Sequence, residues 1–95
     1  MGTYKLSREA LADLARIYEH GLVQHGEQQA DRYVATLFER FEQLVAHPLS
    51  YPAADDVREG YRRSVCGSDT IFYRLSGDDI EVMAIIGRQD FDSWV

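Results

Sequence analysis

The residues with the clearest chemical potential are arginines that stand among aromatic residues between positions 58 and 75. This stretch holds four of the ten basic residues of a chain whose formal net charge is −6. A guanidinium group can bind a phosphate or a carboxylate through two parallel hydrogen bonds, and several together can stabilise developing negative charge. The candidate polar set for binding a target or a partner is Arg58, Tyr61, Arg62, Arg63, Tyr73, Arg74 and Arg88.

Two interpretations of this set stay open from the residues alone. With Tyr61 and Tyr73, the arginines could form an RNA-cleaving site in which charge stabilisation takes the place of a histidine pair. Alternatively, the alternation of side chains along a strand sends Arg62 and Arg63 to opposite faces, where they pair with surface acids.

No other motif with a specific catalytic or metal-binding spacing is present. The three histidines have no ligand partner at helical spacing, and a lone cysteine supports neither a zinc site nor an internal disulfide. Paired aspartates fall in predicted turns, where they bond the local backbone. We therefore expect no metal and no cofactor. The residues concerned are His20, His25, His47, Cys66, Asp55, Asp56, Asp78 and Asp79.

Length and composition predict one globular domain over residues 1–95. The 95 residues are 45% hydrophobic and 27% charged, as in ordinary globular proteins. No apolar run approaches the ~20 residues that a membrane span needs, and no signal segment opens the chain. Cys66 is expected to be a small buried residue in a reducing compartment, so a cytoplasmic location is expected. The net charge of −6 argues against general affinity for nucleic acid.

The first half of the chain predicts a short strand and a helical hairpin. Residues 4–6 alternate as in a strand, and Ser7 can cap the helix that follows. Gly26 ends that helix, and Pro48 ends the second one. The apolar stripe of the first helix is Leu11, Leu14, Ala15, Tyr18 and Leu22, and that of the second is Ala30, Tyr33, Val34, Leu37, Phe38, Phe41, Leu44 and Val45.

The second half predicts three strands, at about 61–66, 70–75 and 80–86. Gly67-Ser68 and Gly77-Asp78-Asp79 supply the turns, so the strands form an antiparallel meander. The fold class is therefore α+β, with the order strand-helix-helix-strand-strand-strand. A helical hairpin packs on a small, mainly antiparallel sheet.

The last strand is apolar at five consecutive positions, from Val82 to Ile86, so apolar side chains point from both of its faces. One face packs on the helices, and we expect a partner protein to cover the other, because an exposed apolar patch marks an interaction site. Alternatively, the segment from Phe91 to Val95 folds back over it. The expected partner contacts are Met83, Ile85 and the outer side of the helical hairpin. Because the register of the strand is open, these two residues could instead be core.

This order of elements and motifs resembles the ParE toxins of the RelE/ParE superfamily. The resemblance covers nearly the whole chain, and its central part is the arginine-aromatic stretch with its Gly-Ser turn. The motifs, in order, are Tyr4-Lys5-Leu6-Ser7, Ala12-Asp13-Leu14, Gly26, Gln29-Ala30, His47-Pro48, Arg58-Glu59-Gly60-Tyr61-Arg62-Arg63, Gly67-Ser68 and Ile71-Phe72-Tyr73-Arg74.

The resemblance implies the toxin of a type II toxin–antitoxin system, neutralised by a ParD-like antitoxin that folds over it. ParE relatives inhibit DNA gyrase by binding, whereas RelE relatives cut messenger RNA on the ribosome with a lysine-bearing site and a terminal tyrosine. Here Lys5 is the only lysine, and the C-terminal segment has Phe91 and Trp94 but no tyrosine. This favours the ParE branch, with no covalent chemistry of its own and with DNA contacted only through antitoxin or gyrase. The alternatives are a RelE-like ribosome-dependent endoribonuclease and a non-toxic module that binds antitoxin for autoregulation.

Two positions differ from the pattern of this family. Relatives often carry histidine where Asp69 and Gly87 stand here. The resemblance therefore implies that these two positions bear on potency or target.

Overall fold

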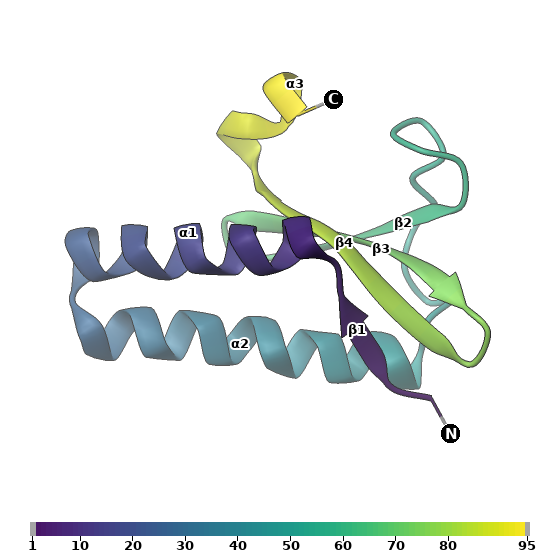
Figure 1. Cartoon of the computed structure of the whole chain (residues 1–95), viewed down its shortest axis with the longest axis horizontal. Coiled ribbons are helices and arrows are strands. Elements are labelled where there is room, and N and C mark those ends of the chain that lie inside the picture. Colours follow the sequence, from purple (N-terminus) through teal and green to yellow (C-terminus); the bar gives the residue numbers. More distant parts are fainter. Residues whose placement is uncertain (1, 95) are drawn as a thin grey trace.

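The computed structural model describes residues 2–94, except for the side chain of Gln89. Two α-helices pack along one face of a four-stranded sheet, and a short C-terminal helix packs on the cluster at the opposite face (Figure 1). The predicted α+β class and element order are confirmed. The bounds are β1 (Tyr4–Leu6), α1 (Arg8–His25), α2 (Glu27–Ala46), β2 (Tyr61–Cys66), β3 (Asp69–Ser76), β4 (Asp79–Gly87), the 3-10 turn η1 (Arg88–Asp90) and α3 (Phe91–Trp94).

The ends of the helical hairpin follow from single residues. The Ser7 hydroxyl accepts a hydrogen bond from the Ala10 amide at 3.0 Å and caps α1. Gly26, at φ +89°, is the one residue between α1 and α2, and its amide donates to the Leu22 carbonyl. α2 ends at Ala46, just before His47-Pro48. The predicted cap and helix ends are therefore confirmed.

The buried side of α1 differs from the predicted stripe. Its buried residues are Ala10, Asp13, Leu14 and Ile17, whereas Leu11 is 54% exposed. Of the predicted stripe, only Leu14 is buried. The error arose because an aspartate stands on the core-facing side, so the apolar pattern alone followed a neighbouring stripe of the helix.

The sheet has the order β1-β4-β3-β2, with β1 parallel to β4 and the other pairs antiparallel. The predicted meander of β2, β3 and β4 is confirmed, with strand ends within one residue of the prediction. The helical hairpin connects β1 to the meander. The last strand of the meander, β4, lies beside β1, which forms one edge of the sheet.

A β-bulge at Met83 explains the five consecutive apolar residues of β4. Phe72 pairs with Ala84 while Tyr73 pairs with Val82, so Met83 is the extra residue. Beyond the bulge the alternation shifts by one. Val82 and Ile85 both belong to the core against the helices, and Ala84 belongs to a second cluster on the opposite face.

The second face is covered by the chain itself. The Phe72 ring stacks on Trp94 with a centroid distance of 4.9 Å and on Phe91 at 6.0 Å, and Ala54 and Val57 of the 47–60 loop join the same cluster. The expectation that a partner covers this face was therefore wrong, and the alternative of a C-terminal segment folding back holds for residues 91–94. Val95 lies outside the described residues.

No helix among residues 2–94 combines the length and apolar character needed to cross a membrane.

Candidate functional site

The arginines of the candidate polar set do not converge on one point. Arg63 makes a two-point ion pair with Asp56, at 2.6 and 2.8 Å, and Arg74 donates twice to Glu81 at 3.0 and 2.8 Å. Arg62 donates to the Tyr51 carbonyl at 2.7 Å. All three guanidinium groups are therefore hydrogen-bonded to other residues of the chain.

Arg62 and Arg63 lie on opposite faces of the sheet, as the second interpretation of the sequence described. Arg63 stands 5.7 Å over the Phe72 ring, on the face that the C-terminal segment covers. Arg62 contacts Tyr51, which packs on the helical core. The Arg63 hydrogen bonds hold the pKa of the Asp56 carboxyl below its ordinary value.

The remaining members of the candidate set are spread over the molecule. Tyr73 is fully buried and donates to the Pro48 carbonyl at 2.6 Å, and burial raises its pKa to about 12. Tyr61 is half-buried beside the second cluster. Arg58 and Arg88 are exposed, on the 47–60 loop and in η1.

The expected partner contacts on β4 need a correction. Ile85 is fully buried between the sheet and the helices, so it is core rather than a partner contact. Met83 is half-buried at the bulge, and its carbonyl accepts a hydrogen bond from the Ser7 hydroxyl at 2.8 Å. The bulge is the physical reason, because it turns Ile85 toward the helices.

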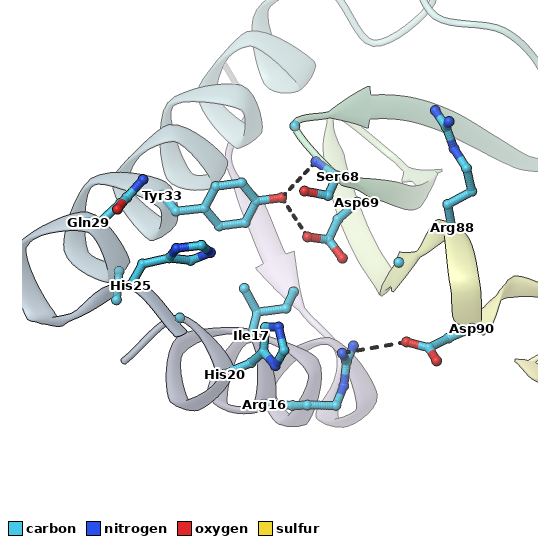
Figure 2. Close-up of a pocket in the computed structure, with 14 residues that line it drawn as sticks. Arg16, Ile17, His20, His25, Gln29, Tyr33, Ser68, Asp69, Arg88 and Asp90 are labelled. Atoms are coloured by element: carbon cyan, nitrogen blue, oxygen red, sulfur yellow. Dashed lines mark hydrogen bonds and ion pairs between the residues drawn. The ribbon is translucent and has the colours of Figure 1, made fainter. Parts of the chain in front are cut away.

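The main concave feature is a groove of about 750 Å³ between the helical hairpin and the β2–β3 turn, here called the Tyr33 groove. Figure 2 shows its walls: the helices contribute Arg16, Ile17, His20, His25 and Tyr33, and the sheet and C-terminal segment contribute Ser68, Asp69, Arg88 and Asp90. His20 and His25 thus line the same groove as the β2–β3 turn, although they lie far from it in the sequence. Among the described residues, no three potential metal ligands come together.

Tyr33 fixes the turn that borders this groove. Its hydroxyl donates to Asp69 Oδ2 at 2.5 Å and accepts from the Ser68 amide at 3.1 Å. Gly67 sits under the ring at φ +62°, where an added Cβ would lie 2.6 Å from Tyr33 Cε1. Burial, followed by the bond to Asp69, raises the pKa of Tyr33 to about 12. Tyr33 was predicted only as a member of the apolar stripe, and its hydroxyl gave no sequence signal.

Asp69 and Gly87, the two positions singled out in the sequence, face one another in this groove. Asp69 and Gly87 are direct partners in the β3–β4 register. A Cβ built on Gly87 would lie 3.3 Å from Asp69 Oδ1 and 3.5 Å from Asp90 Oδ2. The two positions therefore belong to one small region of the structure.

α1 also carries a buried carboxylate, Asp13, on the side that faces β4. Asp13 Oδ2 accepts from the Ile85 amide at 2.9 Å, and Arg16 donates to the Ile85 carbonyl at 3.0 Å. Burial raises the pKa of Asp13 despite these bonds. The sequence signal was a charged residue between Ala10, Leu14 and Ile17, on what would otherwise be an apolar side.

A second candidate surface is the outer helical face, defined as Leu11, Ala15, Tyr18 and Leu22 of α1 with Val34 and Phe38 of α2. Tyr18 donates to Asp31 at 2.7 Å, and this bond places the two helical stripes side by side. The face is apolar yet accessible: Leu11 is 54% exposed, and Leu22 and Phe38 are 37% exposed.

Comparisons with known proteins agree with this architecture. Residues 4–90 match the family described as the ParE toxin of the type II toxin–antitoxin system parDE. The chain is 35% identical over 91 residues to Toxin ParE1 of Mycobacterium tuberculosis H37Rv, covering 94% of this chain and 93% of that protein. It is also 35% identical over 86 residues to Toxin ParE1 of Caulobacter vibrioides, covering 90% and 88%.

Among solved structures, the fold resembles a chain of the chromosomal ParDE toxin–antitoxin system from P. aeruginosa. The TM-score is 0.80 at 25% identity, with 92% of this chain and 96% of that chain covered. The toxin–antitoxin complex RelBE2 from M. tuberculosis contains a chain with the same fold at a TM-score of 0.65 and 19% identity, covering 90% and 96%. The chain belongs to the ParE toxin family of type II toxin–antitoxin systems.

Proposed function

We propose that this protein is a toxin that inhibits DNA gyrase by binding it and that a ParD-like antitoxin neutralises it. The observation that carries the proposal is the family match over residues 4–90, together with the identity to two ParE1 toxins. The distribution of arginines supports binding rather than catalysis, because Arg62, Arg63 and Arg74 are each bonded within the fold.

The outer helical face is the surface that we assign to the antitoxin. Its apolar residues stay partly exposed, and they lie at the helical spacing that receives an amphipathic segment. The acids Glu19, Asp31 and Glu42 are exposed around it. An antitoxin segment that combines apolar anchors with flanking basic residues would complement this face.

Expression of the chain alone in a bacterial host tests the target. We expect growth arrest with a DNA-damage response, and we expect the purified protein to block supercoiling by purified gyrase. Co-expression of the small protein encoded next to this gene should restore growth. A catalytically inactive RelE-type toxin makes a suitable negative control in the gyrase assay.

Two other results would each replace the proposal with a named alternative. Cleaved transcripts without gyrase inhibition would identify a ribosome-dependent endoribonuclease. Normal growth, with antitoxin binding intact, would identify a non-toxic module that serves autoregulation.

A further inference from the structure

Asp69 carries a buried carboxylate. One of its oxygens accepts a hydrogen bond, and the other faces the Tyr33 groove. The residue is only 8% exposed, and its Oδ2 accepts from the Tyr33 hydroxyl. Its Oδ1 has no hydrogen-bond partner among the side chains that the structure describes, and Figure 2 shows the carboxylate directed into the groove. A carboxylate oxygen at the wall of a groove can accept a charge-assisted hydrogen bond from a cationic donor.

Gly87 leaves room beside this oxygen. The point where its Cβ would stand is 3.3 Å from Asp69 Oδ1 and 3.5 Å from Asp90 Oδ2, so two carboxylates face one small space. The backbone of Gly87 is extended at φ −70°, so its conformation does not itself require glycine. The absence of a side chain at Gly87 therefore leaves open space beside Asp69, and the backbone conformation does not depend on it.

The cations already near the groove do not fill this space. Arg16 donates to the Ile85 carbonyl at 3.0 Å and to Asp13 at 3.5 Å, and its closest approach to Asp90 is 3.9 Å. Arg88 lines the groove, but its guanidinium points away from the Asp69 carboxylate in Figure 2. Neither arginine therefore forms an ion pair with Asp69.

We propose that Asp69, with Asp90 across the gap at Gly87, receives a basic side chain of the antitoxin. An arginine fits best, because the five donors of its planar guanidinium can reach both carboxylates at once, whereas an ammonium acts as a point charge. The inference extends the proposed function, since the antitoxin supplies the cation. It makes Asp69 a specificity-determining residue for the choice of partner.

The first test uses a small probe and does not depend on any antitoxin. Amide chemical shifts are followed by NMR while N-acetyl-arginine amide or its glutamine analogue is titrated into the full chain. We expect the arginine probe alone to move the amides of Ser68, Asp69 and Gly87, and we expect Asp69→Asn to abolish this response. Equal responses to both probes, or a response unchanged in Asp69→Asn, would overturn the proposal.

Asp69→Asn is suitable because the amide oxygen of asparagine can still accept from Tyr33. Asp78→Asn is its matched control, since it removes the same charge from the exposed β3–β4 turn. Gly87→Ala is the second variant: it keeps every charge but puts a methyl group between the two carboxylates. We expect Gly87→Ala to weaken the response as well, and Asp78→Asn to leave it unchanged.

The second test measures affinity for the protein encoded next to this gene, with each of its basic residues changed in turn to glutamine. One of these changes should weaken binding at least about tenfold to the wild-type toxin and by less than twofold to Asp69→Asn. If all of them act equally on both toxins, the proposal is wrong even though the antitoxin binds. If the wild-type toxin does not bind this protein while the arginine probe still binds at Asp69, only the proposed antitoxin role is overturned.

Discussion

At the scale of single residues, the polar groups that shape the site are buried ones that the sequence pattern concealed. Asp13 stands on the core side of α1 and bonds the Ile85 amide, and Tyr33 bonds Asp69 across the β2–β3 turn. Neither contact follows from periodicity, because each joins residues more than 35 positions apart. The arginines, by contrast, were conspicuous in the sequence but are mostly bonded within the fold.

Asp13 gives a prediction for stability against pH. Because burial raises its pKa, the native state holds this proton more tightly than the unfolded state does. The wild type should therefore gain stability relative to Asp13→Asn as the pH falls through the raised pKa toward the ordinary value of 3.8. Urea unfolding of the two proteins between pH 7 and pH 4 measures this gain.

Two further variants make this measurement specific. Asp13→Ala leaves the Ile85 amide without its acceptor and should cost about 1–3 kcal/mol at every pH. Asp78→Asn, on an exposed turn, should parallel the wild type. A wild type that loses stability relative to Asp13→Asn on acidification would mean that Asp13 is stabilised as a carboxylate in the fold.

At the scale of elements, local patterns predicted the strands and helices well but not the sides that they present. Ser7, Gly26 and Pro48 mark the ends of the helices because caps and proline act within one turn. The orientation of β4 could not be predicted, since it depends on a bulge opposite Phe72 and Tyr73. The stacking of Trp94 on Phe72 could not be predicted either, because the two residues are distant in sequence.

The β2–β3 turn gives a prediction at this scale, with a control inside the chain. Gly67 and Gly77 both have positive φ, at +62° and +63°, but only Gly67 lies against the Tyr33 ring. Each change to alanine should cost about 1–2 kcal/mol for the left-handed backbone. Gly67→Ala should cost about 1–3 kcal/mol more, because its Cβ meets the ring at 2.6 Å.

Urea unfolding of the two variants gives the comparison directly. Equal losses of stability would show that the Tyr33 ring can move aside without cost. The same experiment in a Tyr33→Leu background should bring the two losses closer together, because the crowding atoms are then gone.

At the scale of the whole molecule, most of the exposed large apolar residues among residues 2–94 belong to the helical hairpin, although Val65 of β2 and Leu75 of β3 are exposed as well. The chain covers its second sheet face with its own residues, so any stabilisation by antitoxin must come from other surfaces. A partner that binds only the native state at 100 times its Kd adds about 2.7 kcal/mol. For a domain of this size we expect a rise in Tm of roughly 10–20 °C.

Leu11→Glu should reduce the rise in Tm that the antitoxin causes, because it places a charge in the proposed contact between the antitoxin and the outer helical face. Leu75→Glu is the matched control, since Leu75 is similarly exposed, at 45%, but lies on β3. Thermal melts of each variant with and without antitoxin provide the measurement. If Leu75→Glu reduces the rise as much as Leu11→Glu does, the outer helical face is not the antitoxin surface.

The contacts of Asp13 and Arg16 with Ile85 have one more consequence. Past the end of β1, the backbone of β4 would otherwise offer its amide and carbonyl to a strand from another molecule, and these two side chains take both groups. On the far side of the sheet, Ala53 bridges Arg62, and Arg40 donates to the Val65 carbonyl at 2.7 Å. These contacts remove backbone groups that both edges of the sheet would otherwise offer to a strand of another molecule, and so disfavour extension of the sheet at these positions.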